Sequence, residues 1–107
     1  MGNTWHTNVE HFLDLDGLPA LDLPRPAELL LDYFGAIIEA VTSQNQKSTV
    51  MTEVRCRRRP GRRRCEGQIL AVIDEDDPSI IRWECPVCSD RGFLYGWQGT
   101  VWDQKPT

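Results

Sequence analysis

The pattern of apolar and polar residues changes twice along the chain, near Pro24 and near Ser48. Between these points, residues 26–43 place apolar side chains at the spacing of three and four that is typical of an amphipathic helix. Pro26 and Glu28 suit the first turn of such a helix. The apolar stripe is wide, so we expect this helix to pack on a sheet, with a second copy of itself as the alternative.

After residue 48 the hydrophobic period becomes two, which is typical of half-buried strands. Strand-like runs rich in β-branched and aromatic residues cover 50–56, 67–74, 79–85 and 91–97. Gly, Pro and Asp separate these runs, as expected for turns. The pattern therefore predicts an α+β fold in which an N-terminal helix packs on a small four-stranded antiparallel sheet within residues 48–102.

The segment before the helix differs from both of these zones. Residues 1–24 mix Leu with Asp and carry prolines, which predicts an extended acidic arm with a short helical turn near 7–13. Residues 25–107 would then form a single domain, consistent with a chain of 107 residues. The N-terminus lacks a basic start followed by an apolar run, and no stretch approaches the roughly 18 apolar residues of a membrane span. We therefore expect a soluble, cytoplasmic protein.

Four cysteines carry the clearest chemical signal: a C-x8-C pair, then nineteen residues, then a C-x2-C pair. In an intracellular chain this pattern favours a metal over disulfides, and a tight turn such as ECPVC can supply two corners of a tetrahedral Zn²⁺ site. The predicted ligands are Cys56, Cys65, Cys85 and Cys88. Because four thiolates complete the coordination shell, the zinc would be structural.

Other interpretations of the cysteines stay open at this point. Cys56 and Cys65 could form a disulfide, the thiols could be free and buried, or the C-x2-C pair could be redox-active. The last is disfavoured because the pair lies between strands and not at the start of a helix. His6 or His11 could replace one thiolate, although a single His in an arm is more often an ordinary surface residue.

The segment CPVCSDRG resembles the second knuckle of zinc-ribbon (zinc β-ribbon) domains, in which CPxCG precedes a strand. The resemblance covers roughly residues 48–100, and it implies a zinc-ribbon-like sheet. This chain has Ser89 where the ribbon pattern has Gly, and C-x8-C where the ribbon has a first C-x2-C. The run WECPVCSDRGFLYGWQGTVWD is also similar to the C-terminal part of small uncharacterised bacterial proteins that contain CPxC. That similarity implies zinc binding and no particular activity.

Between the first two cysteines lies CRRRPGRRRC, a basic segment with acidic sequence on both sides. A turn at Pro60 and Gly61 would pair the flanking residues so that Cys56 faces Cys65, and would place like charges opposite one another at a projecting tip. Some of the arginines would offset the charge of the thiolates, and the surplus would face a partner. The arginines are Arg57, Arg58, Arg59, Arg62, Arg63 and Arg64.

Three functions remain open for this hairpin. It could bind nucleic-acid phosphates, with an aromatic ring such as Trp83, Tyr95 or Trp97 stacking a base, although these rings are more often core. Alternatively, the protein could be a protein–protein adaptor. The hairpin would then bind an acidic partner, while the apolar helix or the acidic arm binds a second chain. A solvated loop without a partner is the third possibility, and the arm could also mask the arginines.

Catalysis has little support in the sequence. There is no Gly-rich phosphate loop and no Ser-His-Asp set at usable positions. The acidic run DEDD at 74–77 precedes a proline in a predicted turn, where carboxylates are more often solvated than bound to Mg²⁺. We therefore expect a non-enzymatic binding module with a structural zinc, present as a monomer or a homodimer. Its arginine hairpin is expected to bind nucleic-acid phosphates, with the protein–protein adaptor as the alternative.

Overall fold

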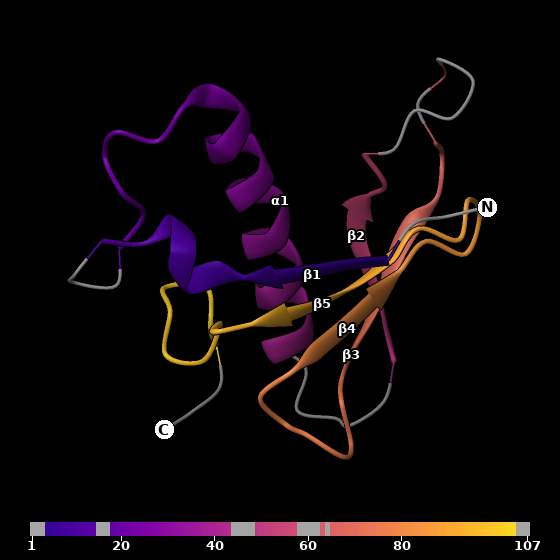
Figure 1. The fold of residues 1–107 in the computed structure, drawn as a ribbon. Helices are drawn as coiled ribbons and strands as arrows, with labels where there is room; N and C mark the ends of the chain where they lie inside the picture. The colour runs from indigo at the N-terminus through magenta and orange to yellow at the C-terminus, as the bar shows by residue number, and fades with distance from the viewer. Residues whose placement is uncertain (1–3, 15–17, 44–48, 58–62, 64, 105–107) are drawn as a thin grey trace.

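The computed structural model describes residues 4–14, 18–43, 49–57, 63 and 65–104, and it contains one helix and one five-stranded sheet in these parts of the chain. Figure 1 shows the helix lying across one face of the sheet. In chain order the elements are strand β1 (Thr4–Asn8), the 3₁₀ turn η1 (Val9–Phe12), helix α1 (Arg25–Thr42), and strands β2 (Val50–Arg55), β3 (Gln68–Ile73), β4 (Ile81–Glu84) and β5 (Arg91–Tyr95).

Helix α1 confirms the predicted amphipathic helix and its packing on a sheet. It follows Pro24 and has Pro26 in its first turn, where a missing N–H costs no helical hydrogen bond. It ends at Thr42, and the N–H of Ser43 still bonds to the carbonyl of Glu39. Its buried apolar side chains recur at helical spacing and face the sheet; they are Leu31, Phe34, Ile37, Ile38 and Val41.

The sheet has the order β1-β5-β4-β3-β2, so the prediction of four antiparallel strands is wrong in one respect. Strands β2 to β5 do form the predicted antiparallel meander, but β1 adds a fifth strand parallel to β5. The sequence had assigned this segment to an extended arm. Pairing between Thr4 and Arg91 joins positions 87 residues apart, which no local pattern can reveal. The added strand covers an edge of β5 that would otherwise expose unpaired N–H and C=O groups.

The helix covers only part of one face of this sheet. Five strands spaced about 4.8 Å apart span about 19 Å, whereas a helix with its side chains is about 10 Å wide. Helix α1 packs mainly over β2 and β3 and touches η1, so it leaves room beside β1. On the opposite face, no described helix covers the exposed side chains such as Arg82 and Arg91.

Of the three rings that the sequence favoured as core, Trp83 and Trp97 are buried, whereas Tyr95 is only partly buried. Trp83 is 4% exposed and Trp97 is fully buried, while the indole N–H of Trp97 donates to the carbonyl of Ser79. The helical turn expected near 7–13 corresponds to η1, whose Val9 is fully buried. No helix in the described ranges has the length and apolar character needed to cross a membrane.

Val9→Ala tests whether the N-terminal segment is packed in solution as it is here. Because Val9 is fully buried, removing two methyl groups should lower the free energy of unfolding by about 1–3 kcal/mol, measured by urea denaturation. His11→Ala, at an exposed position of the same turn, is the matched control and should change stability by less than about 0.5 kcal/mol. Equal stability of the two variants would show that the segment is not packed on the domain.

Candidate metal centre

The four cysteines lie at the same end of the sheet because of the antiparallel strand order. Cys56 directly follows β2 and Cys65 shortly precedes β3, while Cys85 directly follows β4 and Cys88 precedes β5. In an antiparallel meander the end of one strand lies beside the start of the next. The two hairpin ends therefore meet, and the predicted four residues are brought together.

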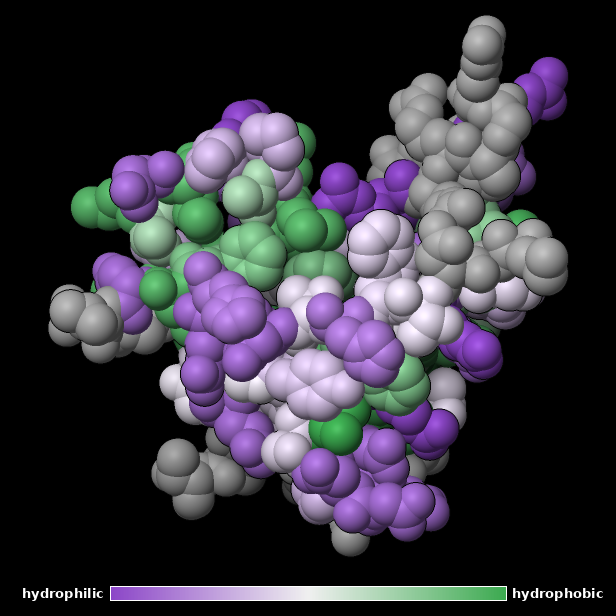
Figure 2. Space-filling model, viewed as in Figure 1, coloured by the Kyte–Doolittle hydropathy of each residue, from purple (hydrophilic) through white to green (hydrophobic). Residues whose placement is uncertain are grey.

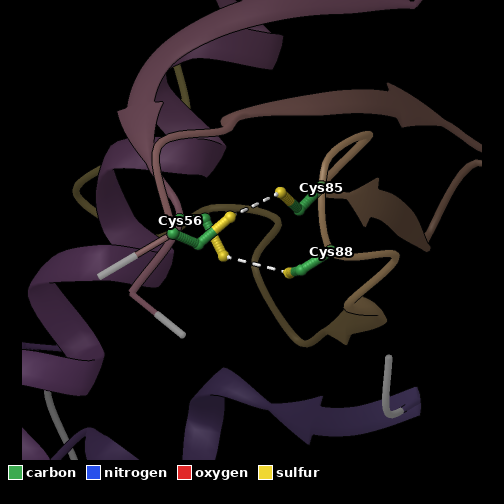
Figure 3. Close-up of side chains that lie close together, drawn as sticks. Cys56, Cys85 and Cys88 are labelled. Atoms are coloured by element: carbon green, nitrogen blue, oxygen red, sulfur yellow. Dashed lines mark hydrogen bonds between the residues drawn. The ribbon is translucent and has the colours of Figure 1, made fainter. Parts of the chain in front are cut away.

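The sulfur atoms are close enough to share one metal ion. All four Sγ atoms lie within 4.8 Å of one another, with 3.7 Å between Cys56 and Cys88 and 3.5 Å between Cys65 and Cys85. Figure 3 shows the Cys85 and Cys88 side chains pointing across a narrow gap toward Cys56. A tetrahedral ion with metal–sulfur bonds of about 2.3 Å would hold its sulfurs about 3.8 Å apart. All four cysteines are free thiols, so the structure does not contain the alternative disulfide.

The C-x2-C half of the site is a tight turn whose backbone points at the sulfurs. The N–H of Cys85 bonds to the carbonyl of Asp90 at 2.7 Å, and the N–H of Ser89 bonds to the carbonyl of Cys85 at 2.9 Å. The N–H groups of Val87 and Cys88 donate to the sulfur of Cys85, and that of Asp90 donates to the sulfur of Cys88. This is an arrangement that can orient two ligands and stabilise their negative charge.

The two thiols of this turn differ in acidity. Burial opposes ionisation of Cys85, but hydrogen bonds from the N–H groups of Cys88 and Val87 and from the neighbouring thiols of Cys65 and Cys88 together outweigh it, so its pKa lies below the usual value of a thiol. Burial raises the pKa of Cys88 above the usual value, and the N–H of Asp90 offsets this only in part. Without a cation, therefore, one thiol of the pair ionises before the other.

The other half of the site corrects the predicted hairpin register. Val50 pairs with Ala71, as a turn at residues 60 and 61 would require, but the register then shifts and Arg55 pairs with Gln68. Cys56 consequently bonds through its N–H to the carbonyl of Gly67 and does not face Cys65 directly. The irregularity lies where the buried Thr52 hydroxyl bonds to the carbonyl of Ile69, and where the N–H of Val54 bonds to Thr52 Oγ1.

Gly67 is a residue of the site that sequence reasoning missed. Its N–H lies 3.4 Å from the sulfur of Cys65, and a Cβ atom at this position would collide with the sulfur of Cys85. Only glycine leaves room for a sulfur from the neighbouring hairpin at this point. A glycine two residues after Cys65 is visible in the sequence. Its role in the site cannot be predicted from there, because the sulfur that it makes room for belongs to the other hairpin.

Ser89 occupies a left-handed backbone conformation, with φ of 64°. This conformation costs an ordinary residue about 1–2 kcal/mol, and glycine adopts it freely. The zinc-ribbon pattern has Gly at this position, so the turn geometry accounts for that preference. Ser89 retains the geometry at a cost in strain.

The remaining candidate residues lie apart from the sulfurs or outside the described residues. Arg58, Arg59, Arg62 and Arg64 fall in the undescribed part of the hairpin, as does its predicted tip. Arg57 is described and lies over the ring of Tyr33, 5.6 Å from its centre, and Arg63 is exposed.

Neither the first histidine nor the acidic run joins the metal centre. His6 stacks on Phe93, and its Nδ1 lies 3.1 Å from the hydroxyl of Tyr95. In the DEDD run, the Asp77 carboxylate accepts bonds from the N–H and hydroxyl of Ser79, while Asp74 lies 3.8 Å from Arg82. These carboxylates stabilise their own turn, and the one group of metal-ligating side chains found among the described residues is the cysteine cluster.

Comparisons of the chain with protein-family models, curated proteins and solved structures give no match. Membership of the zinc-ribbon family therefore stays a prediction. The metal centre rests on the geometry of this chain alone.

Gly67→Ala should selectively weaken metal binding. The new methyl group would occupy the position of the Cys85 sulfur, so we expect metal affinity to fall at least tenfold in a competition titration with a chelator. Gly99→Ala is the control: Gly99 has a positive φ of 76°, and a Cβ there meets no atom within 4 Å. The control should lose stability through backbone strain and keep its metal affinity. Equal affinities in the two variants would contradict this packing of the sulfurs.

Proposed function

We propose that this protein is a small binding module in which a structural Zn²⁺ fixes the base of an arginine-rich hairpin, and that the hairpin binds nucleic-acid phosphates. The observation that carries the proposal is the position of Cys56 and Cys65 in one four-sulfur cluster. These two residues bracket the arginines, so a metal bound to both would close the segment into a loop. Closing the loop reduces the number of conformations that the arginines lose on binding.

Zinc is the metal that best suits four cysteines. Thiolates favour soft or borderline ions, and Zn²⁺ accepts the tetrahedral geometry that four sulfurs at these separations permit. Three of the four cysteines are buried, and the fourth is partly buried, which excludes solvent from most of the site. No ligand position is left for a reactive water, so the ion would stabilise the fold and would not catalyse a reaction.

Native mass spectrometry tests the metal. The wild-type protein should carry one zinc, and the denatured, unreduced protein should have the mass of four free thiols. Cys85→Ser should lose the zinc and unfold the sheet near the site, because binding energy at a structural zinc site is also folding energy. Ser89→Ala, in the same turn, is the control and should retain the zinc. A metal-free wild type with oxidised cysteines would refute the zinc proposal.

The balance between the charge of the metal centre and that of the arginines supports the proposal that the hairpin binds a partner. Four thiolates on one Zn²⁺ leave a net charge of −2, which two or three guanidinium groups offset. Six arginines lie between the cysteines, so several exceed this need. Guanidinium groups bind phosphate through paired N–H donors. Residues 18–24 of the acidic segment lie on the other side of α1 from β2, so this part of it does not cover the base of the hairpin (Figure 1).

A salt titration tests nucleic-acid binding. Replacing Arg58, Arg59, Arg62 and Arg63 by Ala should weaken binding to unrelated sequences alike. Each lost phosphate contact should reduce the slope of log affinity against log salt by about 0.7 for a single strand. Arg25→Ala is the control, since Arg25 lies at the start of α1 and pairs with Glu28. An unchanged affinity and slope in the quadruple variant would contradict the proposal.

The adaptor function is the second candidate, and one observation favours it. Apolar side chains gather over the N-terminal part of α1 and the segment before it (Figure 2), where Leu18, Leu21 and Leu29 are exposed. Leu21 is fully exposed, and exposed apolar patches commonly mark protein contacts. If nucleic acid does not bind, a pull-down that loses its protein partner on Leu21→Ser and Leu29→Ser substitution would support the adaptor.

A further inference from the structure

A cavity of about 320 Å³ lies between α1 and β1, next to the first arginine of the hairpin. It exists because α1 packs over β2 and β3 and leaves the β1 side of the sheet uncovered. The volume is at the lower end of the range for small-molecule sites, so it suits one ring-bearing group. Its walls are mainly aromatic, with a cation and an acid; these residues are Trp5, Tyr33, Phe34, Trp83, Arg57 and Asp90.

Two of the residues that line the cavity have a buried polar atom without a hydrogen-bond partner among the described residues. Tyr33 Oη and Trp83 Nε1 are both buried, and neither makes a hydrogen bond within the described residues. Buried donors are nearly always satisfied in folded proteins, so these two donors in residues of one cavity wall point to an acceptor that a small movement of their side chains would admit. A tyrosine hydroxyl is protonated at neutral pH, and burial raises the pKa of Tyr33 further, so its hydroxyl is a donor.

The backbone places the indole of Trp83 over β5 and facing β1. Trp83 pairs with Gly92, and Gly92 pairs with Trp5 on the next strand. A Cβ atom at Gly92 would lie 2.8 Å from Trp83 Nε1, so the absence of a side chain there lets the indole extend over β5. Trp5, about half exposed, forms the outer wall, and its own N–H donates to the carboxylate of Asp90.

The charges decide which kind of acceptor fits. Asp90 lines the cavity, so an anion buried beside its carboxylate would be repelled. The inner acceptors must be neutral, as the carbonyl oxygens of a base are. Arg57 lies over the ring of Tyr33, and a guanidinium stacked in this way can still donate its N–H groups to a phosphate. The cavity thus matches a flat ring with neutral acceptors and an anionic group attached.

We propose that this cavity binds one nucleotide, with its base between the aromatic rings, its carbonyl oxygens at Tyr33 and Trp83, and its phosphate at Arg57. The inference rests on the proposed function in one respect, since Arg57 begins the arginine hairpin. The nucleotide comes either from an unpaired position of a strand or from solution. Thymine and uracil, with two carbonyl oxygens, fit better than adenine, which has none.

Binding of short oligonucleotides by fluorescence anisotropy tests the proposal. The wild-type protein should bind a labelled thymidine hexamer more tightly than an adenosine hexamer or a duplex of equal length. Tyr33→Phe should weaken thymidine-hexamer binding about tenfold, the effect of one lost hydrogen bond to a buried donor. The same variant should leave the melting temperature of the free protein unchanged or raised, because the hydroxyl that it removes has no hydrogen-bond partner in the part of the chain that the structure describes.

Tyr95→Phe is the matched control. Its hydroxyl lies near His6 on the other face of the sheet, away from the cavity, so hexamer binding should not change. Trp83→Phe provides a second test of the inner wall, and its zinc content and circular dichroism report whether it folds. Tyr33→Phe removes only one oxygen atom, so we expect it to fold. It therefore still tests the proposal if the tryptophan variant does not fold.

The outcomes separate this inference from the proposed function. If the quadruple arginine variant loses hexamer binding while Tyr33→Phe and Trp83→Phe bind like the wild type, the cavity proposal is overturned and the hairpin proposal stands. If no strand binds but thymidine monophosphate does, and Tyr33→Phe weakens it, the cavity takes a free nucleotide and the hairpin proposal fails. If neither strand nor monophosphate binds, or if adenosine and thymidine hexamers bind equally, the cavity proposal is overturned.

Discussion

The gathering of four cysteine sulfurs within 4.8 Å of one another is the constraint on which the rest of this structure depends. Four thiolates this close repel one another unless a cation lies between them. A shared metal would turn that repulsion into a link between the β2–β3 and β4–β5 hairpins. In a domain of this size the hydrophobic core is small, so such a link would contribute much of the stability at this end of the sheet.

The core itself is formed at the middle of the sheet, where α1 lies over β2 and β3. One helix cannot cover five strands, and the structure accommodates this limit in two ways. Large aromatic side chains extend from the helix and from β4 toward β1, with Tyr33 meeting Trp83 edge to face at 6.1 Å between ring centres. The space that remains becomes the cavity beside Arg57. Its position next to both the metal centre and the hairpin follows from the same packing.

The metal centre and the cavity also share structural elements. Asp90 holds the cysteine turn through its backbone and bonds to Trp5 through its carboxylate. Arg57 directly follows a cysteine of the cluster and lies over the ring of Tyr33. Loss of the metal would therefore disturb the cavity wall as well as the base of the hairpin. A bound metal would then help to position the cavity and the hairpin proposed to bind nucleic acid, as well as stabilise the fold.

The sequence by itself determined the features that depend on local order. Helical spacing in 26–43, period two after residue 48 and the C-x2-C turn each arise from neighbouring residues, so helix α1, strands β2 to β5 and the set of four cysteines could be predicted. The tertiary structure alone decided the parallel pairing of β1 with β5 and the shifted register that places Gly67 against a sulfur. It alone also formed the cavity at Tyr33 and Trp83. These features depend on contacts between residues far apart in the chain. Such contacts produce no periodic pattern in the sequence, so they could not be predicted from it.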